Sequence, residues 1–177
     1  MPIKNLFFEF IQSPDRDTYL AIRKAVLSSD DYDPYSDEMQ TVGELLEDGR
    51  PDEAFQALAA AMPNLLLSPR AHLALAHIAE ESGQGEKAKM EEFFAVSCCE
   101  GILATGAGTR ENPFLVVRTS DEHDLLQYLE KTFTGQSLQE IDGRHFDVIT
   151  CSDGSKLWFD ISDTYAQLEK RFGDPPE

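Results

Sequence analysis

The chain has 177 residues, of which 33 are acidic and 15 are basic, so its formal net charge is −18 at pH 7. This length predicts one domain with a sizeable core, and a charge of this sign repels nucleic acid and anionic membrane surfaces. The apolar runs are much shorter than the roughly 20 residues that cross a bilayer, and the three cysteines form neither a disulfide framework nor a zinc pair. We therefore expect a cytoplasmic protein that binds no nucleic acid and no membrane.

The first helices are predicted from their start signals and apolar stripes. Glu9 interrupts the apolar run near the N-terminus, so this segment is expected to belong to the folded chain rather than to an export signal. Ser13-Pro14-Asp15 predicts a helix capped by Ser13, with an apolar stripe through Tyr19, Ile22, Val26 and Leu27. Ser36 is predicted to cap the next helix, which ends at Gly49.

An acidic segment, Asp30 to Glu38, separates these two helices. Its carboxylates are the oxygen ligands that calcium takes in flexible loops. An EF-hand starting at Asp33, however, would place Glu38 where the sharp turn needs glycine, and one starting at Asp31 would place Val42 where the bidentate glutamate belongs. We therefore favour a solvated turn over a cation site.

An internal repeat is the most informative feature of the sequence. EDGRPDEA (47–54) aligns with ESGQGEKA (81–88) at a shift of 34 residues, which is the tetratricopeptide period. Each unit is predicted to be a helix, a glycine turn and a second helix, with Ala54 and Ala88 as the small residues that let the paired helices approach closely. Two units expose apolar faces that another element must cover.

The chain after Arg110 is predicted to be richer in β-structure. Phe114 to Val117 is typical of a strand, and Ser120-Asp121-Glu122 begins a helix whose apolar side carries Leu125, Leu126, Tyr128 and Leu129. Asp142-Gly143 and Asp153-Gly154 predict type I′ hairpin turns in a three-stranded antiparallel meander. Phe146, Val148, Leu157 and Phe159 are expected to pack on the helices. A last helix from Asp163 to Phe172, capped by Ser162, is expected to stop at Gly173 and Pro175.

We find no constellation typical of an enzyme, and we expect no cofactor and no metal. Gly106-Ala107-Gly108 follows a helix and precedes a strand, which is the reverse of a nucleotide-binding loop, so we interpret Gly106 as a left-handed helix cap. Cys98 and Cys99 lie in an apolar helix and are expected to be buried rather than nucleophilic. His145 and Asp147 predict a surface ion pair, and Trp158 is expected to pack on a neighbouring strand.

Several short motifs occur together in one order along the chain. They are Tyr32-Asp33-Pro34-Tyr35, Arg70-Ala71-His72, Gly101-Ile102-Leu103 followed by Gly106-Ala107-Gly108, Asp142 to Val148, and Phe159-Asp160. In this order the chain resembles an uncharacterised bacterial family of unknown function, over roughly residues 18 to 168. The resemblance implies tetratricopeptide-like helices followed by a β-rich part, and it implies no catalytic residues. Ala107 stands where a polar residue is expected between the glycines, and the export signal of many relatives is not found.

The fold class expected is therefore α+β. One domain, 1–177, would hold a helical repeat-like part (13–105) and a β-rich part with two helices (106–177), with tetratricopeptide-like hairpins capped by a small meander. The expected function is non-catalytic protein binding, with a basic or amphipathic peptide drawn by the acidic field. The first helices of the repeats predict a groove lined by Ser36, Met39, Gly43, Arg70, His77 and Glu80. A small acidic chaperone or immunity-type inhibitor of a basic client is the alternative, and a metal-dependent hydrolase is the least favoured. The sequence indicates no oligomeric state.

Overall fold

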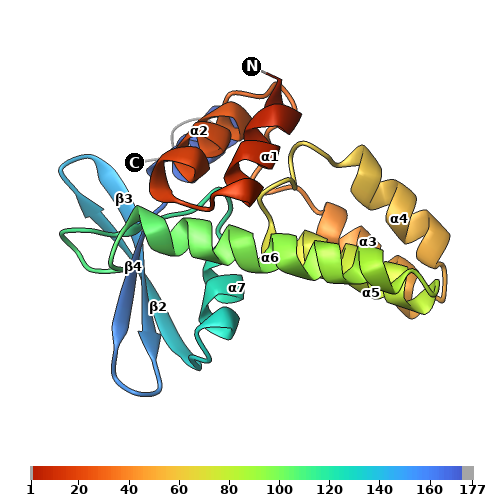
Figure 1. The fold of residues 1–177 in the computed structure, drawn as a ribbon. Coiled ribbons are helices and arrows are strands. Elements are labelled where there is room, and N and C mark those ends of the chain that lie inside the picture. The colour runs from red at the N-terminus through yellow and green to blue at the C-terminus, as the bar shows by residue number, and fades with distance from the viewer. Residues whose placement is uncertain (1, 173–177) are drawn as a thin grey trace.

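The computed structural model describes residues 2–172, which form eight helices and one four-stranded sheet (Figure 1). The helices are α1 (Ile3–Gln12), α2 (Arg16–Leu27), α3 (Glu38–Glu47), α4 (Pro51–Ala60), α5 (Pro69–Glu81), α6 (Gly85–Thr105), α7 (Ser120–Tyr128) and α8 (Ser162–Phe172). The strands are β1 (Phe114–Leu115), β2 (Phe133–Ile141), β3 (Arg144–Cys151) and β4 (Lys156–Asp160). The expected α+β class is confirmed. Gly173 and Pro175, the expected stop of the last helix, lie outside the described residues.

The 34-residue repeat has a structural counterpart in the two helical hairpins α3–α4 and α5–α6. Gly49 and Gly83 have nearly the same backbone φ, 69° and 71°, which glycine adopts without steric cost. At the first turn the amide of Arg50 donates to the carbonyl of Leu45 at 2.8 Å, and at the second the amide of Gln84 donates to that of Ala79 at 2.8 Å. Both turns are thus Schellman helix ends that differ only by the repeat shift.

The starts of α2 and α3 differ from the expectation. Asp15, not Ser13, is the N-cap of α2, because its carboxylate accepts from the amides of Asp17 and Thr18, and the Thr18 hydroxyl completes a capping box. Helix α3 begins after Asp37, and no side chain caps it. The hydroxyl of Ser36 instead accepts hydrogen bonds from Arg118 and Asn64, which are distant in the chain.

The sheet has the order β1-β4-β3-β2. Strands β2, β3 and β4 form the expected antiparallel meander, and β1 adds to β4 in parallel, so the sheet is mixed. The turn at Asp142-Gly143 is type I′, since both residues have positive φ, 52° and 72°. The second hairpin is different: only Gly154 has positive φ, and the amide of Gly154 donates to the carbonyl of Cys151. It is a three-residue loop built on a type I turn, because the ladder closes at Cys151 and Ser155.

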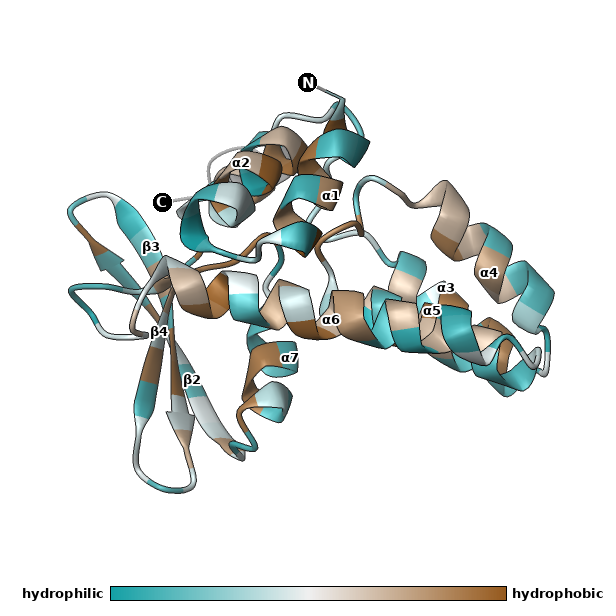
Figure 2. Cartoon of the chain, viewed as in Figure 1, coloured by the Kyte–Doolittle hydropathy of each residue, from teal (hydrophilic) through white to brown (hydrophobic). Residues whose placement is uncertain are grey.

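Two hydrophobic clusters hold the fold together. The larger lies where α1, α2, the C-terminal half of α6, α7 and the sheet meet, and the smaller lies between α3, α4 and α5. Figure 2 shows hydrophobic residues concentrated around the larger cluster, whereas the end of the α5–α6 hairpin at the turn between the two helices is mostly hydrophilic. Of the four sheet residues expected to pack on the helices, Leu157 and Phe159 belong to the larger cluster. Phe146 and Val148 are buried on the opposite face of the sheet, because alternate residues of a strand face opposite ways.

Gly106 and Gly108 end α6, but not by a left-handed cap at Gly106. Gly106 is extended, with φ −166° and ψ −165°, and a Cβ there would overlap the backbone of Pro113. The left-handed residue is Gly108, with φ 66°, and a Cβ there would overlap the ring of Phe114. The glycines therefore let the chain double back closely onto β1, and the interpretation of this segment as a boundary between the two parts of the chain is retained for a different reason.

Candidate functional site

Some of the six residues expected to line the repeat groove bind other parts of the chain, and others are exposed. Arg70 binds Asp124 of α7 through its Nε at 2.9 Å and donates to the carbonyl of Ser120 at 3.0 Å. His77 is exposed and lies 3.6 Å from Glu81. Met39 packs on the smaller cluster, Gly43 is half-buried in α3, and Glu80 is exposed. Arg70 therefore joins α5 to α7 and is engaged within the chain.

Ser36 and the acidic segment around it are anchored to distant parts of the chain. The buried guanidinium of Arg118 donates to the carbonyl of Asp33 at 2.9 Å and to the hydroxyl of Ser36 at 2.7 Å. Asn64 also donates to both residues, and the hydroxyl of Tyr32 donates to the carbonyl of Val117 at 2.7 Å. Asp30, Asp31 and Asp37 are exposed, as expected for a solvated turn between helices, and a buried arginine and an asparagine in addition satisfy the loop's backbone. This network joins the α2–α3 loop to the start of α7.

A groove opens on the surface where α5, α6 and α7 meet. Its volume is about 160 Å³, and it is lined by Pro69, Leu73, Ala95, Val96, Cys99, Asp124, Gln127 and Tyr128. The small side chains Ala95 and Cys99 of α6 form its floor, since larger residues there would fill the space. Three residues that line the groove are apolar yet exposed: the exposed fraction is 47% for Leu73, 40% for Val96 and 39% for Tyr128. Tyr128 was expected on the packed side of its helix with Leu125, and that expectation was wrong.

The rim of this groove is acidic. Glu92, Val96 and Glu100 succeed one another at intervals of four residues, so both exposed glutamates lie on the same side of α6 as the exposed valine. The hydroxyl of Tyr128 lies 3.5 Å from a carboxylate oxygen of Glu100. The charge of Asp124, by contrast, is met by Arg70 at 2.8 Å. The groove thus presents apolar walls beside two acidic side chains.

A second group of unusual side chains is the buried carboxyl cluster, formed by Asp121 and Glu122 of α7 and Asp147 of β3. Burial raises the pKa of Glu122 to about 9, and the charges of Asp147 and Asp121 add to this effect. Burial also raises the pKa of Asp121 to about 7, and Asp124 contributes, while the amides of Arg118 and Val117 oppose the rise. Glu122 is therefore a neutral acid beside Asp147 at neutral pH.

The cluster was missed because Asp121 and Glu122 look like ordinary residues of a helix start, and Asp147 looked like a partner of His145. Asp147 is buried instead, and His145 stacks on Tyr165 with ring centroids 3.7 Å apart, so the surface ion pair was wrong. Trp158 does pack on the neighbouring strand, edge-on to Phe146 at 6.0 Å, as expected. Within residues 2–172, no three His, Cys, Asp or Glu side chains are arranged to hold a metal ion.

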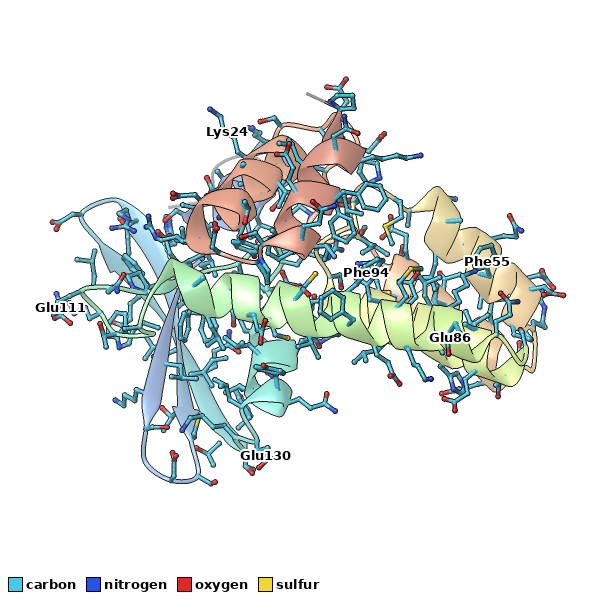
Figure 3. All side chains as sticks on the ribbon, in the orientation of Figure 1. Lys24, Phe55, Glu86, Phe94, Glu111 and Glu130 are labelled. Atoms are coloured by element: carbon cyan, nitrogen blue, oxygen red, sulfur yellow. The ribbon has the colours of Figure 1, made fainter. Side chains whose placement is uncertain are left out.

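Two buried thiols, Cys98 and Cys99, and a buried imidazole, His72, are further groups with reactive side chains. Burial raises the pKa of Cys98, and it raises that of Cys99 to about 12, so both are thiols at neutral pH, as expected for buried residues. His72 lies between two acceptors: its Nδ1 is 2.8 Å from Glu91 and its Nε2 is 2.9 Å from the carbonyl of Leu66. Its ring stacks on Phe7 and meets Phe94 edge-on. Figure 3 shows Phe94 on the central part of α6. The imidazole thus binds α5 to α1 and α6 and does not face the cysteines.

Comparisons with known proteins return nothing similar: no family model, no curated protein and no solved structure matches the chain. No helix formed by the described residues combines the length and the apolar character needed to traverse a bilayer.

Proposed function

We propose that this protein is a non-catalytic interaction module that binds a basic, amphipathic segment of another protein in the groove between α5, α6 and α7. The observation that carries the proposal is the combination of exposed Leu73, Val96 and Tyr128 around one cavity with Glu92 and Glu100 beside it. Exposed apolar side chains gathered at a concave surface with a polar rim are typical of binding sites.

The form of the groove favours a helical segment as its occupant. Exposed groups on three helices surround a cavity large enough for one or two apolar side chains. An amphipathic helix would insert such anchors at positions i and i+4 and would carry lysine or arginine toward Glu92 and Glu100. A net charge of −18 would also speed the approach of a basic partner.

Selection from a random peptide library tests this proposal. Peptides displayed on phage are selected on the protein, and the affinity of each enriched peptide is measured by fluorescence anisotropy. We expect apolar residues at helical spacing next to Lys or Arg. The double variant Leu73→Ser with Val96→Ser should weaken binding by about tenfold or more, because it removes both apolar walls.

Phe8→Ser is the matched control, since Phe8 is 57% exposed on α1, which lies on the other side of α6 from α7 (Figure 1). Its affinity should equal that of the wild type. Enriched peptides that bind the double variant as well as the wild type, or a library that yields no binder, would refute the groove as the binding site.

A further inference from the structure

Strand β2 is a long sheet edge without the usual protection against pairing. It has nine residues, FTGQSLQEI, and it is the last strand of the sheet. Natural edges are blocked by proline, by lysine or by bulges. β2 contains no Pro, Lys or Arg, and its one irregularity lies at its start, between Phe133 and Gly135. Seven of its nine residues are exposed, and both faces of the strand contribute to them.

The backbone groups that point outward follow from the type I′ turn. In a two-residue hairpin the closing pair, here Ile141 and Arg144, exchanges both hydrogen bonds, and such pairs then alternate along the ladder. Ser137 and Gln139 therefore bond to β3, whereas the amides and carbonyls of Gln136, Leu138 and Glu140 point away from it. Within residues 2–172, β3 is the strand that pairs with β2. These three alternate residues of β2 thus each offer one backbone donor and one backbone acceptor to an added strand.

The side chains along this edge suggest the character of an added strand. Leu138 is 52% exposed and Phe133 is 43% exposed, and the ring centroid of Phe133 lies 5.3 Å from that of His123. Glu140 and Asp142 are exposed at one end of the strand, and Glu130 is exposed just before its other end, where Figure 3 shows it at the turn that leads from α7 into the sheet. Lys131 is paired with Asp153 at 2.8 Å. An added strand would meet Leu138 along its middle, Phe133 near one end and carboxylates at both ends.

Charge decides which chain can occupy the edge. Two copies of this protein would each carry −18, so their mutual repulsion opposes the pairing of β2 with β2 of a second copy. An extended basic chain meets no such repulsion and finds Glu140, Asp142 and Glu130 within its reach. We propose that β2 accepts an extended Lys- or Arg-rich segment of a partner protein as a fifth strand. This site is separate from the groove and does not depend on it.

A fluorescein-labelled nonapeptide of lysines alternating with threonine or valine tests the proposal on the full-length protein. The peptide is made in three forms: unmodified, N-methylated at alternate amides, and N-methylated at every amide. An extended chain can turn either set of alternate amides toward β2, so the half-methylated peptide should bind like the unmodified one, whereas the peptide methylated at every amide has no donor for β2 and should bind about tenfold or more weakly. Purely electrostatic attraction would treat the two methylated peptides alike, and equal binding would overturn the proposal.

Hydrogen exchange locates the binding. The amides of Gln136, Leu138 and Glu140 should become protected with the peptide, whereas those of Ser137 and Gln139 are already protected by β3. Leu138→Pro should abolish binding, because proline removes an outward donor, while Leu138→Thr keeps that donor and should retain binding. Should the proline variant fail to fold, the methylated pair on the wild type still decides.

The groove variant Leu73→Ser with Val96→Ser should bind this nonapeptide normally, which separates the two proposals. Protection confined to α5, α6 and α7, or self-association of the free protein through β2 in analytical ultracentrifugation, would overturn the assignment of the edge to a basic partner.

Discussion

Replacing Glu122 by glutamine isolates the contribution of the neutral buried acid. Glu122 is fully buried, and burial, followed by the charges of Asp147 and Asp121, raises its pKa to about 9 from an ordinary value of 4.5. Glutamine has nearly the same shape, and its side-chain amide can donate a hydrogen bond as a protonated acid can, but it cannot ionise. The variant should therefore fold as the wild type does and lose only the titration.

The sign of the effect follows from proton linkage. Between pH 4.5 and pH 9 the folded chain keeps the proton on Glu122, whereas the unfolded chain releases it. The unfolded state thus binds fewer protons, and the free energy of unfolding falls as the pH rises through this window, by about 1.4 kcal/mol for each pH unit. Below pH 4.5 the stabilisation by the neutral acid is fully present. Asp121, whose pKa is raised to about 7, acts in the same direction between pH 3.8 and pH 7 and stays unchanged in the variant.

Urea unfolding followed by circular dichroism at pH 6, 7 and 8 measures the difference. The free energy of unfolding of Glu122→Gln relative to the wild type should rise by about 3 kcal/mol from pH 6 to pH 8. Glu111→Gln is the control, because Glu111 is exposed, as Figure 3 shows at the end of its loop, and its profile should parallel the wild type. Parallel profiles for Glu122→Gln and the wild type would refute a neutral Glu122 in the folded chain.

Three further predictions concern the scaffold around the candidate sites. Gly108→Ala should lower the free energy of unfolding by about 2 kcal/mol, because the φ of Gly108 is 66° and a Cβ there overlaps Phe114. Gly43→Ala, in open space within α3, should instead raise the free energy of unfolding by about 0.5–1 kcal/mol. An equal effect of the two substitutions in urea titrations would contradict this account. Arg118→Lys should cost about 2 kcal/mol by the same assay, since lysine cannot reproduce the forked bonds to Asp33 and Ser36, and a neutral effect would contradict the anchoring of the acidic loop. Cys98, Cys99 and Cys151 should react with Ellman's reagent orders of magnitude more slowly in the folded chain than in urea, and fast labelling of the native protein would contradict their burial.

The local features of this fold could be predicted from the sequence because nearby residues decide them. Pro51 and Gly85 open second helices, Gly49 and Gly83 close first helices, and Asp142-Gly143 forms a type I′ turn. For Pro51 and for the residues with positive φ, the residue's own backbone preference selects the conformation. The second Asp-Gly turn departed from the rule, because the ladder of β3 and β4 closes at Cys151 and Ser155 and leaves three residues for the loop.

Caps and loops were less predictable, since several residues compete for the same role. Ser13 and Ser36 both had the composition of helix caps, yet Asp15 caps α2 and the Ser36 hydroxyl accepts from Arg118, which is 82 residues away in the chain. Such a contact depends on where the start of α7 lies, and periodicity within one segment contains no information about it.

The sequence by itself determined the α+β class, the repeat turns and the acidic field, because composition and short-range spacing are sufficient for these. Only the tertiary structure decided where function could reside. Val96 and Tyr128 form one groove because α6 and α7 pack beside α5, Glu122 becomes a neutral acid because the sheet buries it beside Asp147, and β2 is an open edge because β1 adds to β4 on the far side. Each of these properties arises from residues far apart in the chain, and packing alone brings them together.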